Sequence, residues 1–390
     1  GNLFSHILGQ IDTDNNGVSG IEKSFDYELT TSNKPLKLSL DTEIQYLIRE
    51  ELIKFQEIFN SYGSTAILMN VNSGEIVSMV SIPDFDLNKR EDISDKKFIN
   101  RSTKGVYELG SVFKTFTLAA GLQQNVIQED TLFKNLPKKI KCAGRSISEY
   151  DMDIPSSLTA EEILIRSGNI GSIKIAQKVG LENFKDFLEN LDLLNKIQFD
   201  IEEVGNPIPF KWGKCKLATS AYGHGITTTP LQLAKAYAII ANGGYKIKPT
   251  LIKKEKNLKR GEQIITQENS NKINEILRKI VTSEQGTANL ANIAGYEIAG
   301  KTGTAQKSIK GKYSKKKINT FASIFPISSP KYVLIVLLDE PKLSETYIYE
   351  YNDGKKRKII GTPFNTAGWT SVEVAKNIIE KIGPILAIKY

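Results

Sequence analysis

Segments with the pattern of β-strands lie toward both ends of this chain and enclose a middle third that has the pattern of helices. Residues 65–82 contain two β-branched runs joined at residues 72–74, where Asn, Ser and Gly form a hairpin signal. The strand pattern returns after residue 295, in residues 296–306, 318–327 and 331–341. This order predicts an α+β fold in which both ends of the chain complete one sheet and a helical lobe packs beside it. A cleft between sheet and lobe is then the natural place for a site.

The helical pattern occupies about residues 105–245 and is clearest in residues 111–124, 160–168, 170–180, 183–194 and 230–244. Thr159 with Glu162 forms a capping box at the start of one helix, and Pro230 suits the first turn of another. Apolar spacing predicts an earlier helix over residues 42–60, and a last helix is expected over residues 371–381. Residues 1–35 are polar and show no sustained period, which indicates the end of another unit and a linker.

Composition restricts the kinds of site that this chain can build. The 390 residues are 40% apolar and 25% charged, which is typical of a globular protein and not of a disordered one. With two cysteines, Cys142 and Cys215, and two histidines, His6 and His224, a closed zinc site would need carboxylate ligands. A Ser-His-Asp triad would have to use one of those histidines, and the sequence leaves open whether the cysteines form a disulfide. The net charge of +8 indicates a solvated basic surface and identifies no partner by itself.

Three short strings carry residues suited to nucleophilic catalysis: Ser111-Val-Phe-Lys114, Ser167-Gly-Asn169 and Lys301-Thr-Gly-Thr304. Ser111 follows Gly110 and precedes an apolar run, so we expect it in the first turn of a largely buried helix. Residues three apart share a helix face, which places the Lys114 amine within reach of the Ser111 hydroxyl. Burial would lower the pKa of Lys114 and make it a useful base, while the free N–H groups of the first turn would face an oxyanion. The alternative is a helix-capping serine with a lysine that extends to solvent.

The other two strings would complete such a site. Ser167 and Asn169 fall where one helical pattern stops and the next begins, so a hydroxyl and an amide there could move a proton and bind a substrate amide. A helix C-terminal cap and turn is the simpler alternative. Lys301 lies among small residues on a predicted strand, where it could place a cation, and Thr302 or Thr304 a hydroxyl, against a carboxylate. A surface strand with a glycine bulge is the alternative there.

In this chain order the three strings resemble the signature set of the penicilloyl-serine transferase superfamily, which comprises penicillin-binding proteins and serine β-lactamases. Residues 64–88, 100–122, 222–244, 339–342 and 366–369 are similar to class B penicillin-binding proteins, particularly the septal, cell-division type of α-proteobacteria. The resemblance covers essentially residues 1–390 and implies that family's fold, an antiparallel sheet flanked by helices plus an all-helical lobe. It assigns residues 1–35 to the end of an N-terminal pedestal domain with its linker, and residues 36–390 to the transpeptidase domain.

The resemblance implies a role for each matching residue. Ser111 would be the nucleophile that forms an acyl-enzyme and Lys114 its general base, with Ser167 and Asn169 assisting proton transfer and amide binding. The substrate's terminal carboxylate would be held by the last string, Lys301, Thr302, Gly303 and Thr304. The backbone N–H groups of Ser111 and Thr304 would form the oxyanion hole. The resemblance implies neither a metal nor a cofactor.

The implied reaction is peptidoglycan D,D-transpeptidation in septal wall synthesis. A stem peptide ending in D-Ala-D-Ala would acylate the serine and release D-alanine, and the amine of a neighbouring stem peptide would take the acyl group; β-lactams would acylate the same serine. The implied partners are peptidoglycan stem peptides, a lipid-linked precursor, a membrane-embedded glycosyltransferase and divisome proteins, with no nucleic acid. The chain would lie on the periplasmic face of the inner membrane, behind an N-terminal anchor that precedes Gly1.

Two positions depart from the family pattern: Leu109 replaces the usual proline before the glycine of the nucleophile, and His224 replaces the middle residue of a Gly-Gln-Gly. We interpret His224 as a loop residue near the cleft and not as a base. The lysine-rich residues 308–319 are expected to form a mobile basic loop beside the cleft. Three alternatives stay open: a D,D-carboxypeptidase, a non-catalytic penicillin-sensor domain, and a β-lactamase. The long chain and the lack of an obvious deacylating glutamate after residues 167–169 argue against the last.

Overall fold

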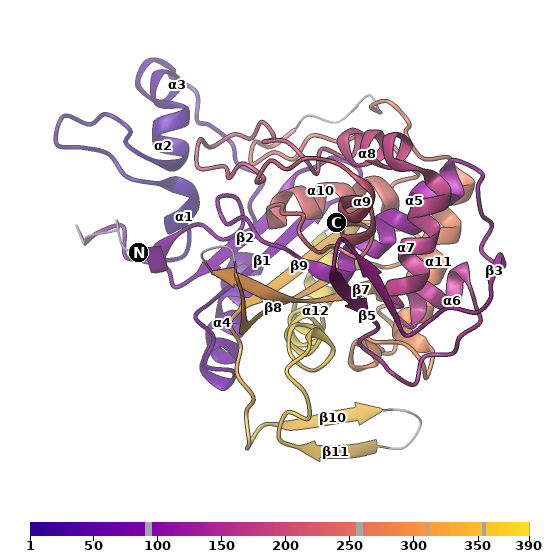
Figure 1. The fold of residues 1–390 in the computed structure, drawn as a ribbon. Coiled ribbons are helices and arrows are strands. Elements are labelled where there is room, and N and C mark those ends of the chain that lie inside the picture. The colour runs from indigo at the N-terminus through magenta and orange to yellow at the C-terminus, as the bar shows by residue number, and fades with distance from the viewer. Residues whose placement is uncertain (90–95, 255–259, 310–311, 353–355, 390) are drawn as a thin grey trace.

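The computed structural model describes residues 1–89, 96–254, 260–309, 312–352 and 356–389, and an antiparallel sheet of five strands lies at its centre (Figure 1). The sheet has the strand order β2-β1-β9-β8-β7. Its strands are β1 (Gly63–Asn70), β2 (Ile76–Ile82), β7 (Ala299–Ile309), β8 (Lys312–Phe325) and β9 (Tyr332–Asp339). The two ends of the chain therefore complete one sheet, which confirms the predicted fold class.

Helices cover both faces of the sheet because its central strands are apolar on both sides. All eight residues of the central strand β9 and the first seven residues of its neighbour β1 are buried. Figure 1 shows α4 (Thr42–Ile58) and α12 (Ser371–Lys389) together on one face, and α10 (Pro230–Ala241) on the other. The predicted helices over residues 42–60 and 230–244 are thus confirmed.

The last helix, α12, continues past the predicted end at residue 381 although Pro384 lies inside it. Proline has no N–H, so the carbonyl four residues earlier, that of Glu380, loses its helical donor. The Tyr296 hydroxyl donates to this carbonyl at 3.4 Å. A side chain from outside the helix therefore replaces the missing donor and lets the helix continue.

The helical lobe contains α5 (Lys114–Gln123), α6 (Ala160–Ile165), α7 (Asn169–Val179), α8 (Leu181–Asn190), α9 (Lys214–Ser220) and α11 (Gln267–Thr282). The predicted capping box starts α6, because the side chain of Thr159 accepts from the N–H of Glu162 and the Glu162 carboxylate accepts from the N–H of Thr159. Thr229 and Gln232 form the same device at the start of α10. The sequence analysis did not predict α9 or α11.

Three short two-stranded sheets were also not predicted. They pair β4 (Lys139–Cys142) with β5 (Arg145–Ser148), β3 (Leu132–Phe133) with β6 (Leu158–Thr159), and β10 (Ile348–Asn352) with β11 (Lys356–Ile360). The remaining short helices are the 3-10 helices η1 (Lys96–Phe98), η2 (Gly110–Phe113), η3 (Asn289–Ala291) and η4 (Ala367–Trp369). Strands this short carry too few residues to show a period in the sequence.

The first residues of the chain form short helices that pack on the body of the protein. These are α1 (Ser5–Leu8), α2 (Gly20–Ser24) and α3 (Asp26–Thr31). Ile7 is fully buried and Ile21 is 4% exposed, both within the main apolar core. The Gln45 side chain on α4 donates to the Leu3 carbonyl at 2.9 Å and to a carbonyl of β2 at 3.0 Å. The domain boundary at residue 35 stays a prediction.

The expectation of a mobile loop over residues 308–319 is wrong for the residues that the structure describes. Residues 308–309 belong to β7 and residues 312–319 to β8, with Ser308 opposite Tyr313; residues 310 and 311 lie outside the described part. The two strands continue pairing beyond the buried part of the sheet. The charged side chains there lie on a two-stranded ribbon. Because this ribbon is exposed to solvent, its sequence does not need the alternation of apolar and polar residues that marks a strand of a buried sheet.

None of the helices in the described parts of the chain has the length and apolarity that a bilayer crossing requires.

Candidate active site

A cavity of about 770 Å³ brings the three sequence strings together. Its lining includes Ser111 and Lys114 from the first string, Ser167 and Asn169 from the second, and Thr302 and Thr304 from the third. Lys301 and Gly303 stand behind this lining: the fully buried Lys301 reaches Ser167 with its amine, and Gly303 lies against the backbone of residue 109. The structure therefore places the residues of all three strings in one site.

Ser111 lies in η2, a 3-10 turn that leads directly into α5. The helix predicted to begin with Ser111 is thus present, with a tighter opening turn. Val112 and Phe113 are fully buried, while the Ser111 side chain is half-buried at the cavity. The turn therefore places the Ser111 side chain at the cavity, while the buried side chains of Val112 and Phe113 hold the turn in the core.

Two glycines allow the backbone around Ser111 to pack closely. Gly110 has a φ of +63°, and a β-carbon there would lie 2.9 Å from the Thr304 carbonyl oxygen. A β-carbon on Gly303 would lie 2.2 Å from the Leu109 carbonyl oxygen. The backbone of η2 and that of β7 therefore touch, and this contact sets the position of the serine against the strand.

Lys114 is 2% exposed, and its amine donates to the Ser167 carbonyl at 2.5 Å and to the Ser167 hydroxyl at 3.1 Å. Burial lowers the pKa of Lys114 to about 7, and the nearby Glu149 carboxylate acts in the opposite direction. The predicted desolvation of this lysine is therefore present. Within the described residues no hydrogen bond joins the Ser111 hydroxyl to Lys114, so the amine that helix spacing places near Ser111 is bonded to Ser167.

Ser167 occupies a strained backbone position at the end of α6. Its φ is +58°, in the left-handed region that glycine prefers. The Ser167 N–H donates to the Leu164 carbonyl at 3.2 Å and the Gly168 N–H to the Ile163 carbonyl at 2.8 Å, the two bonds of a Schellman motif. The simpler reading, a helix C-terminal cap, is correct for the backbone. Because the residue at this position is serine, the cap also carries a hydroxyl into the cavity.

Lys301 joins the same hydroxyl from the sheet. Its amine donates to the Ser167 hydroxyl at 2.9 Å and to the Thr302 carbonyl at 3.2 Å. Burial, and then the proximity of Lys114, hold the pKa of Lys301 well below its ordinary value. Two buried amines thus share one hydroxyl, and the site disfavours a second positive charge until an anion enters.

Asn169 begins α7 and is held by the end of β5. Its backbone N–H donates to Glu149 at 2.6 Å, and its side-chain nitrogen donates to the Ser148 carbonyl at 2.9 Å. Within the described residues the amide oxygen has no protein partner. It therefore remains able to accept a hydrogen bond from a ligand.

The threonines of the third string are fixed by loops on the other side of the cavity. The hydroxyls of Thr302 and Thr287 lie 2.7 Å apart. The Thr304 hydroxyl accepts from the Ala367 N–H at 2.9 Å. The sequence analysis missed Thr287 and Glu149 as parts of the site, since neither lies in a recognisable string.

His224 lies at the edge of the cavity, as predicted. Its ring stacks between Tyr222 and Tyr313, with centroid distances of 5.7 Å and 4.4 Å. Its Nδ1 is 3.6 Å from Glu108, and burial lowers the pKa of the imidazole. The ring thus links the connection before α10 to the β7–β8 ribbon.

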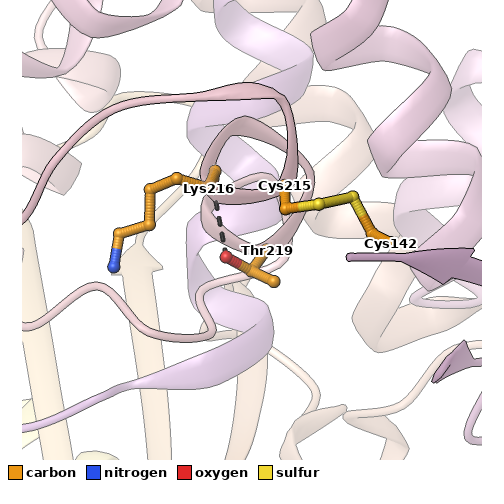
Figure 2. Close-up of a disulfide and its surroundings, with 4 residues drawn as sticks. All are labelled: Cys142, Cys215, Lys216 and Thr219. Atoms are coloured by element: carbon orange, nitrogen blue, oxygen red, sulfur yellow. Dashed lines mark hydrogen bonds between the residues drawn. A yellow bond between two sulfur atoms is a disulfide. The ribbon is translucent and has the colours of Figure 1, made fainter. Parts of the chain in front are cut away.

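A disulfide joins Cys142 on β4 to Cys215 on α9, with 5.6 Å between the two Cα atoms (Figure 2). The sequence had left this pairing open. The bridge spans 73 residues of the chain. It ties the β4–β5 hairpin, whose end holds Asn169, to the helical lobe.

Residues 64–365 match the family described as penicillin binding protein transpeptidase domain. The chain is 31% identical to the probable peptidoglycan D,D-transpeptidase FtsI of Caulobacter vibrioides, over 100% of this chain and 66% of that protein. It is 29% identical to the peptidoglycan D,D-transpeptidase FtsI of Escherichia coli K12, over 89% of this chain and 63% of that protein. The crystal structure of penicillin binding protein 3 from Mycobacterium tuberculosis complexed with aztreonam shares the fold: the TM-score is 0.83 at 24% identity, over 100% of this chain and 90% of that chain.

The fold, together with a serine and two buried lysines that meet in one cavity, defines a serine acyl-transfer domain of the penicillin-binding type. The chain belongs to the penicillin-binding protein transpeptidase family. Within that family it is a class B protein of the septal type, which confirms the resemblance seen in the sequence. The chain spans 66% and 63% of the lengths of the two FtsI relatives.

Proposed function

We propose that this chain is a serine-type peptidoglycan D,D-transpeptidase acting in septal wall synthesis. The observation that carries the proposal is the convergence of Ser111, Lys114, Ser167 and Lys301 at one cavity, with both amines desolvated. A lysine with a pKa of about 7 is neutral in about half of the molecules at pH 7 and in most of them at higher pH, so it can act as a base without histidine. The names of the FtsI relatives support the same activity.

In the proposed reaction Ser111 Oγ attacks the penultimate carbonyl of a stem peptide ending in D-Ala-D-Ala, and its proton passes to the neutral amine of Lys114. The backbone N–H groups of Ser111 and Thr304 stabilise the oxyanion. The C–N bond then breaks, and D-alanine leaves with a proton delivered through Ser167. The amine of a second stem peptide attacks the acyl-enzyme, loses its proton to the site, and releases Ser111 as the alcohol.

The third string binds the terminal carboxylate of the donor peptide. An entering carboxylate raises the pKa of Lys301 and favours its charged form. Lys301 therefore becomes protonated when the substrate binds. Thr302 and Thr304 add hydroxyls, and Gly303 keeps the strand close to η2. The amide oxygen of Asn169 accepts from a peptide N–H of the donor.

The site favours slow release of a bound β-lactam over rapid hydrolysis. A serine β-lactamase needs a base that activates water against the acyl-enzyme. Glu149 is a carboxylate of the cavity wall, but both of its oxygens accept backbone N–H groups at the start of α7. Those bonds orient the carboxylate toward the start of the helix.

The wider assignment follows the family. We propose residues 1–35 as the end of an N-terminal pedestal domain and residues 36–390 as the transpeptidase domain, on the periplasmic face of the inner membrane. The partners are stem peptides and their lipid-linked precursor, β-lactams, a membrane-embedded glycosyltransferase and divisome proteins. The solved relative bound to aztreonam supports the β-lactam assignment.

Covalent labelling with a fluorescent penicillin, followed by mass mapping of the modified peptide, tests the proposal. Labelling is expected at Ser111, and Ser111→Ala should abolish it. Lys114→Ala should slow acylation about 10²- to 10⁴-fold, as loss of a positioned base does. Ser328→Ala is the matched control, because Ser328 and Lys331 have the same spacing outside this cavity. Equal labelling of the Ser111→Ala variant would refute the assignment, and rapid release of the bound penicillin would indicate a β-lactamase.

Offering a donor peptide to enzyme that has not been treated with penicillin separates the remaining alternatives. A peptide ending in D-Ala-D-Ala, supplied with an amine acceptor, should yield D-alanine and the cross-linked peptide. Hydrolysed donor alone would indicate a D,D-carboxypeptidase. No release of D-alanine by an enzyme that penicillin still labels would indicate a sensor domain.

A further inference from the structure

A buried carboxylate at the cavity wall, that of Glu149, has no role in the reaction described above. Glu149 is 8% exposed and follows the last residue of β5. Its Oε2 accepts from the Asn169 N–H at 2.6 Å, and its Oε1 accepts from the Ile170 N–H at 2.8 Å. Both oxygens therefore hold the first turn of α7.

The need for this carboxylate follows from the sequence at the start of α7. The N-cap residue is Gly168, which has no side chain to accept from the free N–H groups of the first turn. Glu149 supplies the acceptors from 20 residues earlier in the chain, in the bond to Asn169. Its negative charge also lies at the positive end of an 11-residue helix, where it is stabilised.

The same chain segment fixes the side chain of Asn169. The Asn169 amide nitrogen donates to the carbonyl of Ser148, the residue before Glu149. Backbone and side chain of Asn169 are thus both held by two consecutive residues. A change at Glu149 releases the helix start and with it the orientation of the amide that faces the cavity.

Glu149 also acts on the proposed base through its charge. The carboxylate favours the protonated form of Lys114 and opposes the effect of burial on the pKa of that lysine. Lys301, from β7, meets Lys114 at the Ser167 hydroxyl, and the proximity of Lys114 lowers the pKa of Lys301. At the rim of the cavity Arg166 and Asp151 pair with each other at 3.0 Å, so their charges largely offset one another.

The hairpin that carries Glu149 is anchored at its other end. Cys142, at the end of β4, is bonded to Cys215 on α9, as Figure 2 shows. Ile147 on β5 is 7% exposed and belongs to the main core. The support for Glu149 is therefore a covalently tethered, packed hairpin and not a free loop.

We propose that Glu149 is a positioning residue for the acyl-transfer reaction: its carboxylate fixes Asn169 at the start of α7 and holds a negative charge beside Lys114. The inference rests on the proposed function, in which Asn169 binds the donor and Lys114 removes the proton of Ser111. Glu149 touches neither the substrate nor the reacting atoms in this scheme.

The test measures the rate constant of acylation by a fluorescent penicillin against pH, using the full chain. Glu149→Gln removes the charge and one of the two acceptors, so the plateau rate should fall on the order of 10-fold or more. Its pH midpoint should move downward, because Lys114 without the neighbouring anion loses its proton at lower pH. Glu149→Asp keeps the charge and shortens the side chain, so its midpoint should stay near that of the wild type while its plateau falls. Asp153→Asn, an exposed acid in the same segment and outside the cavity lining, is the control and should change neither quantity.

The outcomes separate this inference from the proposed function. If the wild type is not labelled at Ser111, the proposed function fails. If the wild type is labelled and the Glu149→Gln variant keeps the wild-type midpoint, the inference is overturned, since a purely structural cap would lower the rate without moving the midpoint. If that variant does not fold, Glu149→Asp tests the positioning of Asn169: a lowered plateau supports that part of the inference, and a wild-type plateau overturns the inference.

Discussion

Replacing Ser167 by glycine should leave the protein more stable than replacing it by alanine, by about 1 kcal/mol. A non-glycine residue at a φ of +58° pays about 1 to 2 kcal/mol for the left-handed conformation. Glycine avoids this term but loses up to about 1 kcal/mol more chain entropy on folding. Both variants remove the hydroxyl that accepts from Lys114 and Lys301, so that loss cancels in the comparison.

The free energy of unfolding of the two variants, measured by denaturant titration, tests this argument. The same pair of substitutions at Ser172, inside α7, is the control and should give the opposite sign, because glycine is about 1 kcal/mol worse than alanine within a helix. Both Ser167 variants should acylate slowly with penicillin, whatever their stability. An alanine variant as stable as the glycine variant would show that the left-handed backbone at position 167 stores no strain.

Two further predictions concern the disulfide and the pH dependence. Replacing Cys142 and Cys215 together by serine should lower the free energy of unfolding by up to about 4 kcal/mol, which is the chain-entropy value for a loop of 73 residues. The measurement is a denaturant titration under oxidising conditions. A loss of stability below about 1 kcal/mol would contradict this prediction. The acylation rate of the wild type should fall as pH decreases through about 7, because Lys114 becomes protonated there and ceases to be a base. A rate that stays constant from neutral to clearly acidic pH would exclude Lys114 in that role.

The sequence was sufficient to predict those parts of the site whose residues lie in short strings on helices and strands. Ser111 and Lys114 open a buried helix, and the third string lies on a strand of the predicted sheet, so fold class and convergence could both be predicted. The disulfide could not, because its formation depends on how close two segments 73 residues apart come in space. Glu149 was missed for the same reason, since it contacts α7 only through the tertiary fold.

Other differences have local causes. The apolar residues of α11 recur at helical spacing, and the helix could have been predicted from Ile273, Leu277 and Ile280, all fully buried. The lysines of the β7–β8 ribbon gave no apolar period because both faces of that ribbon meet solvent. The alternative interpretation of Ser167, a helix C-terminal cap, was correct for its backbone, but the left-handed conformation follows from two hydrogen bonds that no composition rule supplies.

The order of strands in the sheet also has a consequence for how the protein matures. β1 pairs with β9, so the β1–β2 hairpin keeps an open edge until residues 332–339 have been made. Pairing between such distant segments is intrinsically slow, and exposed strand edges invite association with other chains. Under the proposed function, covalent labelling by penicillin should therefore report only the chains in which β9 has joined the sheet.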